Sequence, residues 1–179
     1  GTSILVPGGA EVPVDGSPPR QLSVDDPRSH LSARYSPNGA EIAYISAEGL
    51  VVAAADGSRA RVLVPGDLED FEAWPSPLVW SPTGDRIAFI SHASGQSAET
   101  GRRATELAVL DVTSGGVVPL AEVGVDKMLY SFKFSPEGDQ VLFTRWGATG
   151  EPSLWSVQAD GSDLHRLVAG TSWGDWQKR

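Results

Sequence analysis

The chain has 179 residues and a formal net charge of −9, with 14 lysines and arginines against 23 aspartates and glutamates. Its length suits one domain, and its acidic balance argues against nucleic-acid binding, which needs a basic surface. The 20 glycines and 13 prolines interrupt the chain so often that long helices and membrane insertion by this segment are excluded. There is no cysteine, which excludes disulfides and cysteine-based metal sites.

The first 25 residues carry three short strand patterns. They are residues 1–6, Glu11–Val14 and Arg20–Val24, and a turn at Asp15-Gly16-Ser17 separates the last two. Residues 1–6 match residues 39–44 in residue type at each position. The N-terminus therefore looks like the second, third and fourth strands of a unit that recurs later in the chain.

Three segments then share one pattern, aromatic–Ser–Pro–x–Gly–x–x–aliphatic–x–aromatic. They are Ala33–Ser46, Leu78–Ser91 and Phe132–Arg145. Proline presets the backbone angle that begins a turn, and glycine accepts the positive φ that ends it. Alternating apolar residues flank each turn, so each segment predicts a β-hairpin.

A second pair of strands is expected after each hairpin. The pairs are residues 50–55 with 61–64, 106–111 with 117–120, and 153–157 with 164–168. Four strands in every unit of about 40–50 residues is typical of a β-propeller blade. A single β-sandwich is the rival fold, but a sandwich does not repeat one hairpin motif three times.

The C-terminus supplies the strand that the N-terminus lacks, because Trp176 matches the aromatic residue before Ser-Pro in the other units. We therefore predict an all-β propeller of four four-stranded blades covering 1–179. Three blades span about 32–66, 76–123 and 130–169. The fourth is shared between 171–179 and 1–25, in a Velcro closure. Two alternatives stay open: a dimer of half-rings with eight blades, or part of a larger propeller.

The segment Trp80–Phe89, with the Ala-Asp-Gly-Ser turn at 159–162 in the next unit, resembles the TolB-type (WD40-like) β-propeller repeat. Such repeats build periplasmic scaffolds, surface and lipoprotein receptors, and the gating domains of prolyl-oligopeptidase-like peptidases. The resemblance implies an extracytoplasmic bacterial protein: periplasmic, secreted or anchored to the cell envelope. It supplies no catalytic residue, and TolB-type propellers usually have six blades where this chain shows four.

No catalytic residue emerges from the sequence itself. Ser94-Gly95-Gln96-Ser97-Ala98 lacks the second glycine of a nucleophile elbow, and the three histidines His30, His92 and His165 are far apart. The acidic stretch with Asp67, Glu69 and Asp70 is a weak metal candidate, and calcium is the ion that would suit it. No other cofactor is expected.

Candidate binding residues fall in or beside loops that share one face of a propeller. Exposed tryptophan and arginine side chains dominate binding hot spots, and the longest insertion, 91–105, lies among these loops. The alternative interpretation is that each tryptophan covers the core of its own blade. The candidates are Trp74, Trp146, Trp173, His30, His92, Arg102, Arg103, Arg145 and Tyr130.

The leading hypothesis is a non-enzymatic propeller scaffold that binds a protein or peptide segment through its loop face. The first alternative is a propeller domain accessory to a hydrolase or peptidase, or a small propeller lyase that uses His30 or His92. The second is a sensor domain that binds a small ligand or a cation at an acidic tunnel mouth.

Overall fold

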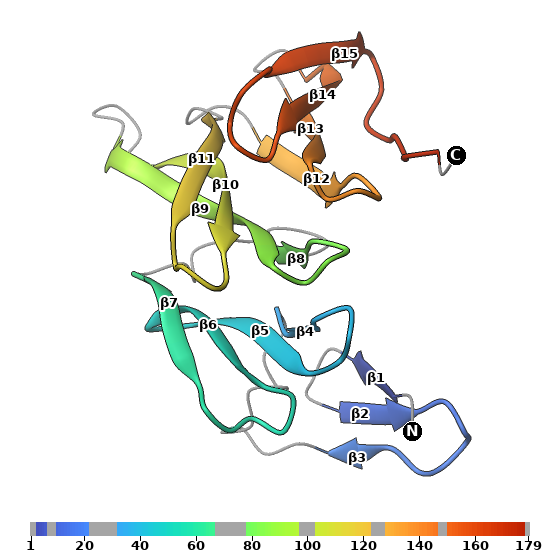
Figure 1. Cartoon of the computed structure of the whole chain (residues 1–179). Coiled ribbons are helices and arrows are strands. Elements are labelled where there is room, and N and C mark those ends of the chain that lie inside the picture. The colour runs from blue at the N-terminus through green and yellow to red at the C-terminus, as the bar shows by residue number, and fades with distance from the viewer. Residues whose placement is uncertain are drawn as a thin grey trace. The chain divides into compact units, whose positions relative to one another are not determined.

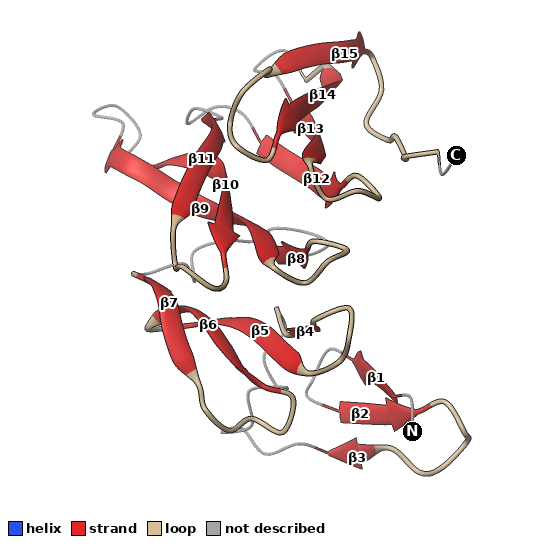
Figure 2. Cartoon of the chain, viewed as in Figure 1, coloured by secondary structure: helices blue, strands red, loops and turns tan. Residues whose placement is uncertain are grey.

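The computed structural model of the chain consists of antiparallel β-strands, and the part of the chain that it describes contains no helix (Figure 2). It describes residues 3–6, 10–21, 32–66, 78–96, 103–122, 128–146 and 150–177. The chain divides into two compact units, Gly1–Asp70 and Phe71–Arg179.

Two antiparallel sheets make up the first unit (Figure 1). One has three strands in the order β1-β2-β3, and the other has four in the order β4-β5-β6-β7. Each strand pairs with the next one along the chain. The bounds are β1 Ser3–Val6, β2 Ala10–Pro13, β3 Arg20–Gln21, β4 Arg34–Tyr35, β5 Glu41–Ser46, β6 Gly49–Ala54 and β7 Arg61–Pro65.

The second unit contains two four-stranded sheets with the same meander, in the orders β8-β9-β10-β11 and β12-β13-β14-β15. The predicted blades thus appear as three complete four-stranded sheets, one in the first unit and two in the second. The bounds are β8 Leu78–Trp80, β9 Arg86–Gln96, β10 Arg103–Asp111, β11 Val117–Glu122, β12 Met128–Phe134, β13 Gln140–Trp146, β14 Pro152–Gln158 and β15 His165–Ala169.

The three complete sheets share one irregularity in their outermost strand pair. The register shifts directly after Leu50, Leu107 and Leu154, which occupy equivalent positions on β6, β10 and β14. Such bulges increase the local twist of a sheet and disturb its outer edge. The repeat therefore extends to the irregularities of pairing as well as to the strands.

The insertion at 91–105, which the sequence places among the loops, is largely strand. β9 continues to Gln96 and β10 begins at Arg103, and Arg103 lies opposite Gln96. Only residues 97–102 lie outside the described part of this hairpin. The expectation of a long loop was wrong here because backbone pairing continues through a stretch rich in serine, alanine and glycine.

The three Ser-Pro turns are built alike. In each, the serine hydroxyl oxygen accepts a hydrogen bond from the amide five residues later and donates one to an Asn or Asp side chain. The glycine amide donates to the serine carbonyl, and each glycine has a positive φ of 70° to 79°. The serines Ser36, Ser81 and Ser135 are all buried. The predicted turns are thus confirmed, and their polar groups are satisfied locally.

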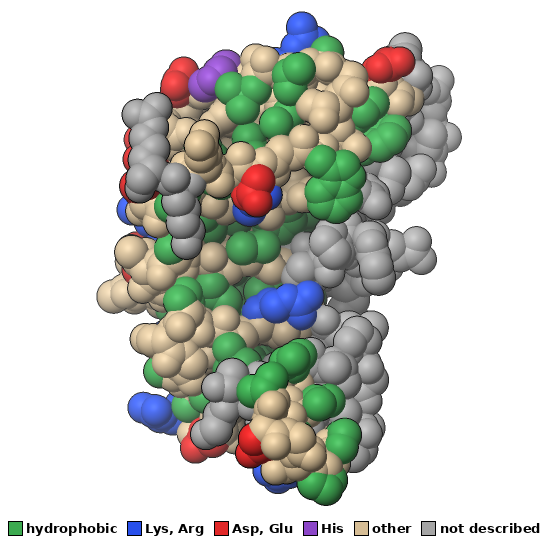
Figure 3. Space-filling model, turned by 90° about the vertical axis from the view of Figure 1, so that its right-hand side faces the viewer, with side chains coloured by type: hydrophobic (Ala, Val, Ile, Leu, Met, Phe, Trp, Pro, Cys, Tyr) green, Lys and Arg blue, Asp and Glu red, His purple; other side chains and the backbone are tan. Residues whose placement is uncertain are grey.

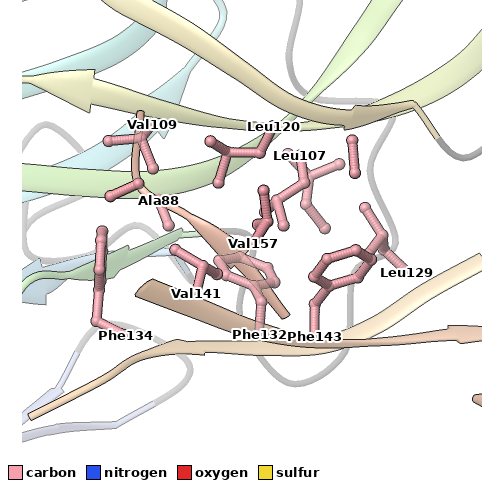
Figure 4. Close-up of a cluster of buried hydrophobic side chains, with 13 residues drawn as sticks. Ala88, Leu107, Val109, Leu120, Leu129, Phe132, Phe134, Val141, Phe143 and Val157 are labelled. Carbon is pink, nitrogen blue, oxygen red and sulfur yellow. The ribbon is translucent and has the colours of Figure 1, made fainter. Parts of the chain in front are cut away.

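The core of the second unit lies between its two sheets. Figure 4 shows Ala88, Leu107, Val109 and Leu120 facing a row of side chains from the other sheet. The opposing residues are Leu129, Phe132, Phe134, Val141, Phe143 and Val157. Alternation along each strand puts these residues on one face, so the two sheets pack face to face like adjacent blades.

The N-terminal sheet has three strands, and the described residues after β15, 170–177, form no strand. β1 is therefore the first strand of its sheet, and no residue of the described ranges pairs with its other edge. The four-blade count and the Velcro closure stay predictions.

Candidate functional site

Two of the predicted tryptophans, Trp146 and Trp173, lie at or shortly after the end of strands of the β12–β15 sheet. Trp146 ends β13 and lies opposite Pro152 at the start of β14, and the Gly170 amide after β15 donates to the Pro152 carbonyl at 2.8 Å. Trp173 follows three residues later. We call this end, where β13 and β15 finish and β14 begins, the loop end of the sheet.

An arginine lies over an aromatic ring beside the loop end. The Arg145 guanidinium carbon is 5.6 Å from the centre of the Trp155 ring, a cation–π distance. The Trp155 ring in turn stacks on Phe143, with ring centres 6.5 Å apart. The Trp155 indole nitrogen donates to the Ser153 hydroxyl at 2.9 Å, and that hydroxyl donates to the Arg145 carbonyl at 3.2 Å. We name Arg145, Ser153 and Trp155 the arginine platform.

Register explains why these three residues meet. Arg145 pairs with Ser153 and Phe143 pairs with Trp155 across β13 and β14, so all four side chains lie on one face. Arg145 takes part in none of the ion pairs formed among the residues that the structure describes. The platform thus offers an oriented cation with donors suited to an anion.

Exposure separates the tryptophans at the loop end. Trp173 is 69% exposed, whereas Trp146 and Trp155 are half-buried. Figure 3 shows hydrophobic side chains at the surface of the part drawn uppermost, where this sheet lies. Of the large hydrophobic residues in the described part of the chain, Trp173 is the most exposed.

Trp155 is not among the binding residues predicted from the sequence. Trp155 does pack against the core of the second unit, and its ring also supports Arg145. The available signal was the spacing on two predicted neighbouring strands, from which register would have placed Arg145 beside Trp155.

The other predicted binding residues are not brought together by the described structure. His92, Arg103 and Tyr130 lie on β9, β10 and β12, and their side chains are outside the described part. Six further candidates lie outside the described residues altogether. They are His30, Trp74, Arg102, Asp67, Glu69 and Asp70.

A hollow of about 460 Å³ lies on the β4–β7 sheet. It is lined by Tyr44, Ser46, Ala47, Glu48, Val51, Ala60, Arg61 and Val62. Burial, and then the nearby Glu48 carboxylate, raise the pKa of Tyr44, which keeps its hydroxyl protonated at neutral pH. Arg61 is held by Glu41 at 3.2 Å.

No group of three or more potential metal ligands occurs among the described residues. In the same part of the chain, no helix has the length and apolar character needed to cross a membrane. The acidic candidates for calcium fall outside this part, so the calcium prediction stays untested.

No protein-family model matches the sequence, and no curated protein matches it. Solved structures do resemble it. Dipeptidyl peptidase 4 of Porphyromonas gingivalis aligns with a TM-score of 0.63 and 9% identity, over 78% of this chain and 25% of that one.

Two further solved structures resemble the chain at a similar level. The β-propeller domain of the Trilobed protease from Pyrococcus furiosus has a TM-score of 0.53 and 14% identity, over 73% of this chain and 40% of that one. An oligogalacturonate lyase in complex with manganese has a TM-score of 0.52 and 14% identity, over 77% of this chain and 36% of the lyase.

The chain spans between 25% and 40% of the length of these three proteins. At such low identity the likeness shows the fold alone. Together with the all-β meander sheets, it shows that this chain has the fold of a β-propeller domain.

Proposed function

We propose that the chain is a non-enzymatic β-propeller domain that binds a polypeptide segment at its loop end. Two observations carry the proposal: the arginine platform on β13 and β14, and the exposed Trp173 in the segment that follows β15. The sheet holds the platform, and a hydrogen bond from Thr144 to Ser172 ties the segment that carries Trp173 to the same sheet, so binding would require little ordering of the site.

The chemistry of the platform selects the kind of segment. A guanidinium recognises a carboxylate with two parallel hydrogen bonds, and stacking on Trp155 keeps its plane oriented. An exposed indole adds apolar area and one hydrogen-bond donor. The expected ligand is therefore an extended segment with a carboxylate near an apolar or aromatic side chain.

The similar solved structures support a related role as an accessory domain. Two of them are named as a peptidase and as the propeller domain of a protease. We propose that this chain contributes polypeptide binding in such a setting. The lyase among them keeps the lyase alternative open, whereas no described cluster of ligands favours the cation sensor.

Two finer predictions belong to the same proposal. The propeller would have four blades closed by both ends of the chain, and it would act outside the cytoplasm, as the TolB-type resemblance implies. Light scattering with and without calcium tests the first: a self-closed ring has the chain mass of 18.9 kDa. Twice that mass would indicate two half-rings.

Selection from a displayed library of random linear peptides, with the intact chain as bait, tests the binding role. Enriched peptides are then synthesised and titrated by tryptophan fluorescence and calorimetry. We expect carboxylate-containing peptides whose affinity falls about tenfold or more in Trp173→Ala and in Arg145→Gln, because hot-spot residues contribute about 2 kcal/mol or more.

Leu167→Ala is the matched control, because Leu167 is also exposed, at 50%, but lies on the outer edge strand β15. It should leave the affinity unchanged. If enriched peptides bind Trp173→Ala and Arg145→Gln as tightly as they bind the unaltered chain, the loop end is not the binding site. If no peptide is enriched over an empty support, the proposed function fails.

A further inference from the structure

A second arginine, Arg166 on β15, lies beside the arginine platform. Trp155 on β14 pairs directly with Arg166, and residues directly opposite each other on neighbouring strands point to the same face. Phe143 pairs with Trp155 from the other side, and Arg145, two residues further along β13, shares the face of Phe143. Trp155 therefore lies on the strand between those of the two arginines, and all three side chains are on one face.

A bulge in the outermost strand pair determines which residue faces Trp155. Leu154 pairs with Val168. Regular pairing would then place Leu167 opposite Trp155. The register shift directly after Leu154 adds one residue on β15, and this brings Arg166 to that position instead. Bulges of this kind redirect a side chain and are frequent next to functional sites.

The other two complete sheets carry no charge at the equivalent positions. Counting from the leucine at which each register shifts gives the equivalents of Arg145, Trp155 and Arg166. The same places thus hold small or apolar residues in two sheets, so forming the sheet does not require two arginines there. The equivalents are Ser46, Val51 and Val62 in the β4–β7 sheet, and Ser91, Ala108 and Pro119 in the β8–β11 sheet.

Neither guanidinium is neutralised within the part of the chain that the structure describes. Arg145 is half-buried and Arg166 is exposed, and neither takes part in an ion pair between residues of the described ranges. Glu151, which directly precedes β14, is exposed and pairs with neither of them. Two positive charges on one face repel each other, so a bound anion would stabilise this arrangement.

Two carboxylates of the preceding sheet point away from the platform. Leu107 of β10 belongs to the same core as Trp155, so it faces the β12–β15 sheet. Its neighbour Glu106 therefore points to the opposite face, and Glu122 does so too because it pairs with Glu106. These two side chains are not placed to neutralise the arginines.

We infer that Arg145 and Arg166 together bind two carboxylates of one extended polypeptide segment. This inference rests on the proposed function, and it names the ligand of that site more closely. Each guanidinium can hold one carboxylate with two parallel hydrogen bonds. In an extended segment only alternate side chains share a face, so the two carboxylates come from positions i and i+2.

Titration of defined peptides followed by NMR tests the inference. Three end-blocked peptides of equal length are compared. The alternating peptide has two glutamates separated by one threonine, the adjacent peptide has the two glutamates side by side, and the single peptide has its second glutamate replaced by glutamine. The Nε–H signals of Arg145 and Arg166 and the indole signal of Trp155 report binding. The ionic strength is held constant, because salt screens exposed charges.

We expect the alternating peptide to bind about tenfold or more tightly than either of the others, because each of those presents only one carboxylate to the platform. Arg166→Gln should remove this preference. Arg59→Gln is the matched control, because it removes the same charge from an exposed position between β6 and β7. It should leave the preference unchanged.

Equal affinity for the alternating and adjacent peptides would overturn the inference, because it would indicate attraction by charge alone. An unchanged preference in Arg166→Gln, or no shift with any peptide at millimolar concentration, would overturn it too. Tighter binding of inorganic phosphate than of the alternating peptide would overturn it and assign a phosphoryl group to the site.

A second variant keeps the test valid if Arg166→Gln alters the spectrum of the free chain. Arg166→Lys retains the charge but lacks the planar pair of donors, so it should lose most of the preference. The peptide-library selection separates the two proposals. Enriched peptides that depend on Arg145 but not on Arg166 would leave the binding role standing and refute this inference. If no peptide is enriched, the binding role itself fails.

Discussion

Replacing Ser81 by alanine isolates what the repeated Ser-Pro turn contributes to stability. Ser81 is completely buried, and its hydroxyl oxygen accepts the Arg86 amide at 3.0 Å while it donates to Asp85 at 2.9 Å. Alanine removes both interactions and leaves the amide without its acceptor. An unsatisfied buried donor costs about 1–3 kcal/mol, so we expect a loss of that size in the free energy of unfolding.

The assay is thermal and urea unfolding followed by circular dichroism and tryptophan fluorescence. In a chain of this length each kcal/mol lowers the Tm by about 2–4 °C, so the expected decrease is about 2–12 °C. Ser162→Ala is the matched control, because its hydroxyl also donates to an aspartate, at 2.6 Å, but in an exposed turn. A surface substitution of this kind changes the free energy of unfolding by no more than about 0.5 kcal/mol.

The pH dependence gives a second readout of the same perturbation. Hydrogen bonds from Thr83 and then Ser81 lower the pKa of Asp85. A lowered pKa in the folded state adds stability above the unfolded pKa, and this is lost as the pH falls through the folded value. The difference in the free energy of unfolding between Ser81→Ala and the unaltered chain should therefore become smaller at acidic pH. Equal losses in Ser81→Ala and Ser162→Ala, or a constant difference at all pH values, would refute the reasoning.

Three further outcomes follow from single positions. Gly49→Ala should lower the free energy of unfolding in urea by at least about 3 kcal/mol, because the φ of Gly49 is +129° and a Cβ there would lie 2.0 Å from a backbone oxygen of β7. Gly39→Ala is the control, since there is open space around Gly39, and it should cost only about 1–2 kcal/mol. Phe143→Ala should cost about 3–5 kcal/mol by the same measurement, because Phe143 is 2% exposed in the core. Burial, and then the Glu122 carboxylate opposite it, raise the pKa of Glu106, so the free energy of unfolding should fall as the pH rises from the unfolded pKa through the raised one. Glu106→Gln should remove this fall when the Tm is measured against pH. An unchanged profile would contradict the assignment.

The turns and the strands were predictable from the sequence because their determinants are local. In Ser135-Pro136-Glu137-Gly138 the proline presets φ, the glycine adopts +79°, and the serine bonds within its own turn. Each of these three features depends only on residues a few positions away in the sequence. Alternation of apolar residues then assigns one face of each strand to the core, as Val141 and Phe143 illustrate.

The extended hairpin between Arg86 and Asp111 was not predictable in this way. Serine, alanine and glycine between 91 and 105 have weak strand preferences. Pairing of the two strands β9 and β10 as far as Gln96 and Arg103 overrides these preferences once the hairpin is in register. Propensity is a weak signal wherever backbone pairing supplies the stabilisation.

The candidate site was likewise predictable only where its determinants are local. The sequence alone identified Arg145, Trp146 and Trp173 as residues near loops, because each lies at or after the end of a predicted strand. That Arg145 lies on Trp155, and that Lys133 and Thr144 hold the segment leading to Trp176, depends on contacts between residues 10 to 42 positions apart. Such contacts are set by the register of antiparallel strands and by the path of the chain across a face. Only the tertiary structure decides these, because a shift of one residue turns every side chain to the opposite face.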